Sequence, residues 1–339
     1  MRKSNIELLR VISMIWIMLS HCFAYGFFQC ENATDLYNFE NIVNRIFIGI
    51  CSGGGDVGVG VFFIITGFFL AEAKKMRMYD PFIRQVYFYG ILCTIIAVAI
   101  NHVGICDIEV YTLISQTLIP LFGTWWFVAV YFFLLFLSGP INMILDNRKS
   151  WIVITTVAVW YSIGLVVHSP YYPLLRGIFY YMLGVIIRKR GNTIRKKWCL
   201  ISFSSLGVIY SLLSMYSYSL GGMDKMGIIG QGIRFIQFTF ISPLMAIALF
   251  TLFEQKEIKH NKLINTLGGA SFGVYLFHEA PYSRILLWTK FFVVDRVVGN
   301  WWMPFYCIGI VLIIYAFVIM VERVRIVFFE RTVCRCLSR

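Results

Sequence analysis

Long apolar stretches separated by short polar segments dominate the chain. Reading spans of about 20 residues, the length that crosses the hydrocarbon core of a bilayer as helix, gives ten: near residues 7–28, 46–71, 86–103, 124–145, 151–168, 173–188, 198–217, 230–253, 263–289 and 301–322. Runs such as "VFFIITGFFL" and "MPFYCIGIVLIIYAFVIMV" are too apolar for the surface of a soluble protein. The pattern predicts an all-α integral membrane protein of about ten transmembrane helices, in a single domain over residues 1–339.

Two stretches depart from this simple alternation. The apolar segment 111–122, "YTLISQTLIPLF", is too short to cross a bilayer, so we expect an interfacial or re-entrant segment there. The stretch 51–60, "CSGGGDVGVG", is rich in glycine. Glycine allows helices to approach closely and also allows a helix to break. Close helix packing and a broken helix that lines a cavity are both compatible with this stretch.

Composition and charge support the membrane assignment. The chain is 59% apolar and 14% charged, whereas a soluble domain has about 25% charged residues. The net charge of +13 could indicate nucleic acid, but 23 of the 30 lysines and arginines fall in segments on one side of the predicted spans. This bias places both termini in the cytoplasm. We therefore expect no nucleic-acid partner and a multi-pass protein of the plasma or inner membrane.

The first span and the cysteines raise smaller questions. Arg10 and His21 interrupt the first apolar run, which favours a retained helix over a cleaved signal peptide. The nine cysteines show no metal-binding spacing, and we expect neither a metal site nor a bound cofactor. Cys30 and Cys106 fall in predicted outer loops and could pair. Cys334 and Cys336 could be acylated or inert.

Ionisable residues interrupt the first span, "ELLRVISMIWIMLSH" (7–21). Helical spacing places Glu7, Arg10 and His21 on one face, with Glu7 and Arg10 one turn apart and able to pair. His21 lies roughly 16 Å beyond Arg10 along the helix, which is about mid-bilayer. An ionisable group at that depth usually marks a functional site. The alternative is a neutral histidine hydrogen-bonded between two helices.

Two further spans carry polar groups at a similar depth. The stretch 271–288, "SFGVYLFHEAPYSRILLW", contains His278, Glu279 and Arg284, and Asp56 lies within the second span. Because lipid penalises each of these groups separately, they are predicted to converge on one buried polar site. Histidine has an ordinary pKa near neutrality and can activate a hydroxyl group. His21 is the expected base, with His278 as the rival base or an orienting group.

Several motifs in fixed order resemble the acyltransferase-3 family of integral membrane acyltransferases. They are "NIELLRVISMIWIMLSH" (5–21), "DVGVGVFFIITGFFL" (56–70), "WWFVAVYFFLLFLSGPIN" (125–142), "YYMLGVIIRK" (180–189) and "SFGVYLFHEAPYSRILLW" (271–288). The resemblance implies transfer of an acyl group, usually acetyl from cytoplasmic acetyl-CoA. The implied acceptor is a sugar hydroxyl of a surface polysaccharide or of its lipid-linked precursor.

The resemblance also implies roles for particular residues. The family histidine falls on His21, its basic partner on Arg10 and its acidic neighbour on Glu7; His278, Glu279 and Asp56 complete the expected catalytic group. The family's R-x-x-R motif is incomplete, because "RQVY" provides Arg84 but has Tyr87 at the second arginine position.

Basic and aromatic residues complete the expected substrate sites. An opening on the cytoplasmic side that binds the phosphates of acyl-CoA would contain Arg10, Lys74, Lys75 and Arg84. Alternatively, these residues only follow the positive-inside rule. Trp125, Trp126 and Arg284 are expected to contact the acceptor, although tryptophans at helix ends can also form an interfacial belt.

Two other classes of function fit part of the pattern. A multi-pass transporter or flippase for a glycan-related substrate would also have polar groups near the midplane. A sensor or scaffold without catalysis is the third possibility. Two histidines at mid-membrane depth favour base chemistry over ion-coupled transport. The sequence does not indicate the acceptor glycan, the acyl group or the oligomeric state.

Overall fold

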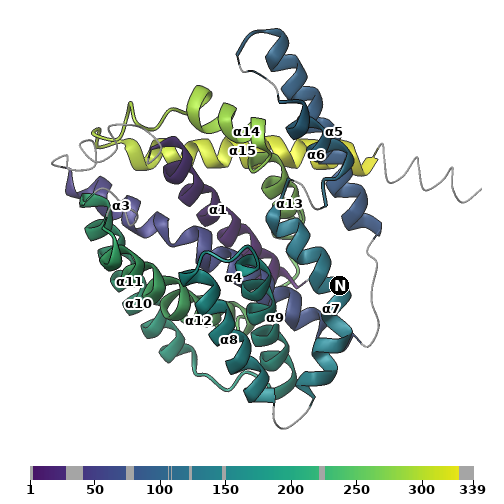
Figure 1. The fold of residues 1–339 in the computed structure, drawn as a ribbon, viewed down its shortest axis with the longest axis vertical. Coiled ribbons are helices and arrows are strands. Elements are labelled where there is room, and N and C mark those ends of the chain that lie inside the picture. The colour runs from purple at the N-terminus through teal and green to yellow at the C-terminus, as the bar shows by residue number, and fades with distance from the viewer. Residues whose placement is uncertain are drawn as a thin grey trace, which may run out of the picture.

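The computed structural model describes residues 3–27, 41–73, 80–105, 107, 109–121, 124–146, 150–220 and 226–327, and all regular secondary structure in these ranges is helical. Figure 1 shows the arrangement. The helices of the first half are α1 (Ser4–Gly26), α3 (Ile42–Ser52), α4 (Gly54–Leu70), α5 (Asp80–His102), α6 (Val110–Leu118), α7 (Trp126–Leu145) and α8 (Ser150–Val166). The second half contains α9 (Tyr172–Arg190), α10 (Lys196–Ser219), α11 (Ile228–Ile236), α12 (Ser242–Glu254), α13 (Lys262–His278), α14 (Pro281–Ile285) and α15 (Met303–Arg325), with π-helical turns at Gln237–Ile241 and Leu286–Phe291.

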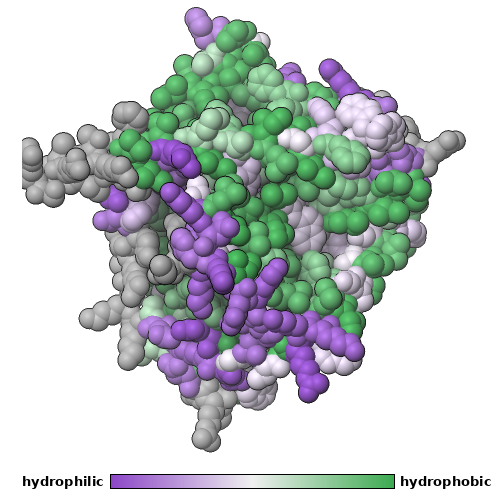
Figure 2. Space-filling model, turned by 180° about the vertical axis from the view of Figure 1, so that it is seen from behind, coloured by the Kyte–Doolittle hydropathy of each residue, from purple (hydrophilic) through white to green (hydrophobic). Residues whose placement is uncertain are grey.

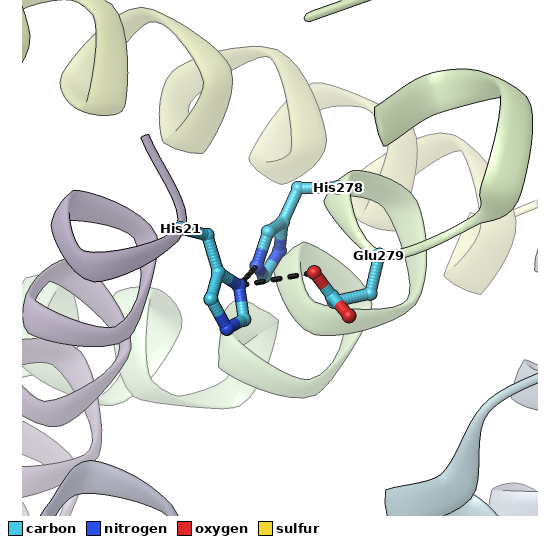
Figure 3. Close-up of side chains that lie close together, drawn as sticks. All are labelled: His21, His278 and Glu279. Atoms are coloured by element: carbon cyan, nitrogen blue, oxygen red, sulfur yellow. Dashed lines mark hydrogen bonds and ion pairs between the residues drawn. The ribbon is translucent and has the colours of Figure 1, made fainter. Parts of the chain in front are cut away.

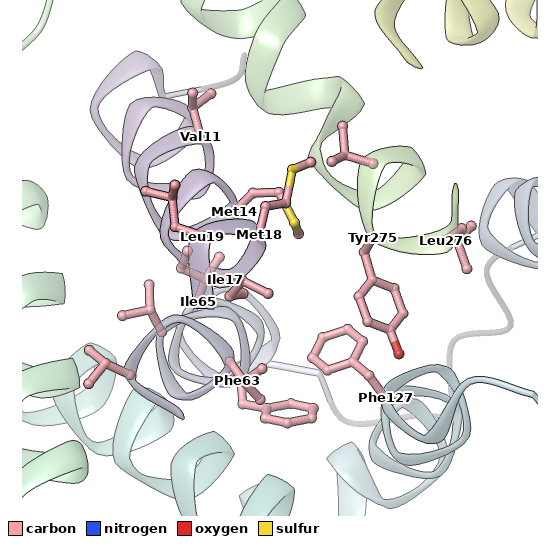
Figure 4. Packing of buried hydrophobic residues seen from close by; sticks show 14 of the residues in the cluster. Val11, Met14, Ile17, Met18, Leu19, Phe63, Ile65, Phe127, Tyr275 and Leu276 are labelled. Carbon is pink, nitrogen blue, oxygen red and sulfur yellow. The ribbon is translucent and has the colours of Figure 1, made fainter. Parts of the chain in front are cut away.

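Helix α1 lies at the centre of the molecule, where it packs against α3, α4, α12, α13 and α15 (Figure 1). Its side chains Met14, Ile17 and Met18 are almost completely buried. Figure 4 shows this cluster facing Phe63 of α4 and the aromatic residues of α7 and α13. A helix that is apolar nearly all round is expected in the interior of a bundle. Polar residues of α1 are therefore held against other helices and not against lipid.

Close glycine contacts hold α4 against its neighbours. A Cβ atom on Gly67 would collide with the backbone carbonyl of Tyr181, and one on Gly184 of α9 would collide with the carbonyl of Ile64. On the other side of α4, a Cβ on Gly58 would lie 2.6 Å from Ile17 of α1. Glycine permits this backbone approach. Of the two roles considered for the stretch 51–60, close helix packing is confirmed, together with a break at Gly53 between α3 and α4.

Among the described residues, seven helical segments are long and apolar enough to cross a membrane: Ser4–Gly26, Ile42–Leu70, Asp80–His102, Trp126–Leu145, Lys196–Ser219, Ile228–Glu254 and Met303–Arg325. The other three predicted spans correspond to α8, α9 and α13, which fall outside this group. The count of ten and the cytoplasmic position of the termini therefore stay predictions. The nine-residue α6 is too short to cross, as expected for the stretch 111–122.

The expected single helix over 263–289 is wrong in its extent. Asn261 caps the start of α13, its side chain accepting a hydrogen bond from the Ile264 amide at 3.0 Å. The helix ends at His278 because Pro281 follows, and a residue preceding proline is pushed out of the helical region. Ala280 accordingly has φ −63° and ψ 137°. The break places His278 and Glu279 at a helix end, where their side chains can face α1.

The outside of the molecule is largely apolar. Large hydrophobic side chains are exposed along α5, α10 and α15, for example Ile95, Leu212 and Ile313. Figure 2 shows hydrophobic residues over much of one face and hydrophilic residues gathered at its lower end. A contiguous apolar exterior of this kind is expected for a surface in contact with lipid. The chain is a multi-pass membrane protein.

Candidate active site

His21 of α1 meets His278 and Glu279 at the end of α13 (Figure 3). The His21 Nδ1 atom lies 3.0 Å from His278 Nε2 and 3.0 Å from Glu279 Oε1. His278 is fully buried. The side chains of His21 and Glu279 are 18% and 8% exposed. The expected convergence of spans one and nine is therefore present in the structure, with His21 as the more accessible member.

Hydrogen bonding indicates which nitrogen carries each proton. His278 Nδ1 lies 2.6 Å from the Val274 carbonyl oxygen, which can only accept, so the proton of a neutral His278 belongs on Nδ1. His278 Nε2 is then an acceptor for the Nδ1–H of His21. A neutral His21 consequently has its lone pair on Nε2. Glu279 is the counter-charge beside the same Nδ1 and would stabilise a protonated His21 ring.

Tyr25 and Arg284 lie beside this trio. The Tyr25 ring is one helical turn beyond His21, with its centroid 5.3 Å from that of the imidazole. The Arg284 guanidinium lies over the Tyr25 ring, 4.7 Å from its centroid, a distance suited to a cation–π contact. Both residues are partly exposed. Tyr25 was not among the residues selected from sequence. The sequence feature that could have indicated it is its position one helical turn after His21.

A cavity of about 720 Å³ begins at the opposite end of α1. Its basic lining comes from three regions of the chain: Arg10 of α1; His260 and Lys262 at the start of α13; and Arg323 and Arg325 at the end of α15. Phe62, Phe127, Tyr131 and Phe272 line other parts of it. The cavity therefore combines cationic and aromatic surfaces, although none of the three members of the trio lines it.

Two aromatic rings connect the cavity lining to the trio by direct contacts. Phe127 lines the cavity and packs against Tyr275, with the ring centroids 5.2 Å apart. Tyr275 in turn meets His278 edge to face at 6.2 Å. Figure 4 shows Phe127 and Tyr275 facing each other between α7 and α13. Phe127 and Tyr275 thus form a chain of ring contacts from the cavity lining to His278.

Glu322 is the acidic residue of the cavity lining, and it is neutralised. Arg325 donates from Nε and Nη2 to Glu322 Oε2 at 3.1 and 2.9 Å, and Gln85 donates to Glu322 Oε1 at 2.8 Å. These residues come from α5 and α15. The sequence analysis selected none of them, because charges near helix ends are also expected from the positive-inside rule.

Asp56 does not join the histidines. Its Oδ1 atom accepts from Arg176 Nη2 of α9 at 2.8 Å, and the Tyr210 hydroxyl donates to Oδ2 at 3.4 Å. Both members of the ion pair are buried. The expectation that Asp56 shares the site of His21 is wrong for direct contact, because a nearer counter-charge satisfies the carboxylate. In the sequence, Arg176 is one of the few lysines and arginines that do not fall on the predicted cytoplasmic side of the spans.

Glu7 and Arg10 pair as expected, with Arg10 Nη1 3.0 Å from Glu7 Oε1. Glu7 is packed beneath α13, where a Cβ on Gly268 would overlap its side chain. At 1.5 Å per residue, Glu7 lies about 21 Å along α1 from His21. The structure thus separates Glu7 from the trio. Arg10 is 31% exposed and lines the cavity.

The other selected residues have mixed placements. Arg84 is exposed on α5 outside the cavity lining, whereas its neighbour Gln85 lines it. Lys74 and Lys75 lie outside the described residues, as do the four cysteines considered for pairing or acylation. Trp125 is 1% exposed, which corrects the expectation that its ring is open to a substrate. Trp126 is exposed and carries Arg176 5.9 Å from its ring centroid.

A buried histidine–carboxylate group and a cation-lined cavity lie within one apolar helical bundle, an arrangement compatible with an enzyme that works inside a membrane. Residues 3–321 of the 339 match the family model Acyl_transf_3, described as an acyltransferase domain. The chain therefore belongs to the acyltransferase-3 family and is an acyltransferase, which sets aside the transporter and scaffold alternatives. No curated protein and no solved structure matches the chain.

Proposed function

We propose that the protein transfers an acyl group, usually acetyl, from cytoplasmic acyl-CoA to a sugar hydroxyl of a surface polysaccharide or its lipid-linked precursor, within the plasma or inner membrane. The observation that carries this proposal is the orientation of His21. Its Nδ1 is engaged by His278 and Glu279, which leaves the Nε2 lone pair for an acceptor hydroxyl.

The chemistry follows from that lone pair. The acceptor oxygen attacks the thioester carbonyl while His21 Nε2 takes the hydroxyl proton, forming the new C–O bond. The tetrahedral intermediate then breaks its C–S bond, and the leaving thiolate takes the proton back from Nε2. A positioned general base contributes typically 10²–10⁴-fold to the rate. Glu279 stabilises the imidazolium between these steps, as the carboxylate does in serine-type triads.

The cavity supports the donor half of the proposal. CoA carries several phosphates, and Arg10, Lys262 and Arg323 provide cationic groups at one cavity. The acyl arm would then extend along the aromatic lining towards His278. Phe127 and Tyr275, which are in contact with each other, would line this route, because Tyr275 also contacts His278. We also propose Lys74 and Lys75 as contacts for the phosphates, whereas Arg84 lies outside the cavity lining and is not among the proposed contacts.

The acceptor is proposed to approach from the side of Tyr25 and Arg284. Tyr25 follows His21 on α1, so it lies beyond His21 as seen from Arg10, and Arg284 of α14 lies over the Tyr25 ring. Both side chains are partly exposed. An aromatic face beside a guanidinium suits a sugar ring with polar substituents. Donor and acceptor would then reach His21 from opposite ends of α1, so that the glycan need not cross the membrane completely. Trp126 is a further proposed contact.

The proposal is tested by acyl transfer from labelled acetyl-CoA in membranes that contain the wild type, His21→Ala or His102→Ala. His102 is exposed at the end of α5 and serves as the matched control. Glycan mass analysis of cells with and without the gene would identify the acceptor by the acyl mass that disappears. Full transfer activity in His21→Ala membranes would overturn the mechanism.

A further inference from the structure

The trio of His21, His278 and Glu279 also has the composition of a metal-binding site. One ligand atom from each residue lies within 4.8 Å of the other two. Two imidazoles and one carboxylate are the ligand set of several catalytic zinc sites, in which a water occupies the fourth position. No metal site was expected from the sequence, because the nine cysteines show no metal-binding spacing.

The hydrogen bonding around His278 is already that of a metal ligand. A histidine that ligates a metal usually donates its other ring N–H to a carbonyl or carboxylate, which fixes the ring and its tautomer. His278 Nδ1 has such a partner in the Val274 carbonyl at 2.6 Å, and its Nε2 faces His21. Glu279 contributes an anionic oxygen at 3.0 Å from His21 Nδ1. One potential ligand atom of each residue therefore lies in the same small region, and His21 Nδ1 becomes a ligand once its proton moves to Nε2.

The spacing requires a small adjustment for a bound ion. Tetrahedral zinc with Zn–N distances of about 2.0–2.1 Å separates its ligand atoms by about 3.3 Å. The two 3.0 Å contacts of His21 would open by about 0.3 Å, and the separation between His278 Nε2 and the Glu279 carboxylate, which is at most 4.8 Å, would have to reach the same value by rotation of the Glu279 side chain. Rotation of the 18%-exposed His21 side chain is the simplest way to open its two contacts, because His278 is enclosed and hydrogen-bonded. Two nitrogen ligands favour zinc or a similar transition metal over magnesium or calcium.

We propose that the trio binds one Zn²⁺ or a similar divalent transition-metal ion through His21 Nδ1, His278 Nε2 and Glu279, and that this ion switches off the base. When the ion takes the Nδ1 lone pair, the ring proton of a neutral His21 moves from Nδ1 to Nε2. Nε2 then donates instead of accepting and cannot take a proton from a hydroxyl. Only this inhibitory half rests on the proposed function; binding of the ion does not.

Metal binding can be measured without any acyl transfer. The purified full-length protein in detergent is titrated with Co²⁺ as a spectroscopic probe, and Zn²⁺ is then added to displace it. We expect one tetrahedral Co²⁺ per chain with no thiolate-to-metal charge-transfer band, since the site contains no cysteine. His278→Ala and Glu279→Gln should each weaken binding by at least about 10–100-fold, the loss that even outer partners of a metal can cause. His102→Ala should bind as the wild type does.

Thermal unfolding of each variant establishes that it is folded before its titration is interpreted. Binding of equal strength in folded His278→Ala, or a spectrum dominated by thiolate ligation, would overturn the metal site. In membranes, Zn²⁺ should inhibit wild-type transfer and a chelator should restore it. Zn²⁺ bound at the trio without inhibition would overturn the switch. Absence of transfer by the untreated wild type would instead count against the proposed function, with the binding result unaffected.

Discussion

Two buried polar clusters lie in the bundle, and they differ in whether all of their polar groups already have partners. At the Asp56–Arg176 pair, a carboxylate meets a guanidinium at 2.8 Å and a tyrosine hydroxyl at 3.4 Å. At the His21 trio, His278 is fixed by a backbone carbonyl, Glu279 is paired, and His21 keeps one nitrogen free and a partly exposed side chain. Charges that neutralise each other stabilise a structure only weakly, but leaving one of them alone is costly. A group with an unused lone pair can act as a base, so this difference supports the proposed catalytic role of the trio, and we propose a structural role for the pair.

The largest expected effect is on the trio itself. His21→Ala should lower acyl transfer by about 10²–10⁴-fold, because the general base is lost, while protein level and membrane insertion stay unchanged. The measurement is transfer from labelled acetyl-CoA at matched protein amounts. If the variant loses stability as strongly as activity, the contrast between the two clusters fails.

The opposite pattern is expected at the ion pair. Arg176→Ala leaves the Asp56 carboxylate buried without its counter-charge and should destabilise the fold by about 3–5 kcal/mol. The double variant Asp56→Leu with Arg176→Met removes both charges and should recover much of that loss. Thermal unfolding in detergent measures both. A double variant that is stable but inactive would show that the pair takes part in the reaction.

The variant Glu279→Gln tests whether the trio needs the negative charge of Glu279 or only its size. The amide keeps the size of the carboxylate but cannot stabilise an imidazolium, so we expect a fall of about 10²-fold in kcat, the effect of losing one electrostatic partner of a reacting group. The KM for the acyl donor should stay near that of the wild type. A variant whose KM rises while kcat is retained would place Glu279 in substrate binding instead.

The smallest effects are expected at the cavity. Arg10→Ala and Lys262→Ala should raise the KM for acetyl-CoA by a few-fold each, because a partly exposed charge contributes about 1 kcal/mol or less, with little change in the KM for the acceptor. Arg84→Ala, on the exposed face of α5, is the matched control. Equal weakening of donor and acceptor use in Arg10→Ala, accompanied by poor expression, would indicate that its pair with Glu7 serves the fold.

Pairing between helices accounts for most of what sequence reasoning missed. Helical periodicity showed that Glu7, Arg10 and His21 share a face of α1, but a face has several neighbours. In the structure Glu7 packs against Gly268 of α13, and Asp56 forms an ion pair with Arg176 of α9. The basic cavity residues Lys262 and Arg323 looked like ordinary positive-inside charges, because nothing local distinguishes a helix end that lines a cavity from one that faces water.

The sequence by itself determined the helical membrane class, the family through its ordered motifs, and the meeting of His21 with His278 and Glu279. The physical reason is that lipid strongly disfavours isolated ionisable groups, so few arrangements could accommodate them. Only the tertiary structure decided which nitrogen of His21 carries the lone pair, because the Val274 carbonyl and the helix end before Pro281 fix the His278 ring that accepts from His21 Nδ1. It also decided that Phe127 and Tyr275 connect the cavity lining to His278 by ring contacts, since packing between α7 and α13 depends on long-range contacts that no local pattern specifies.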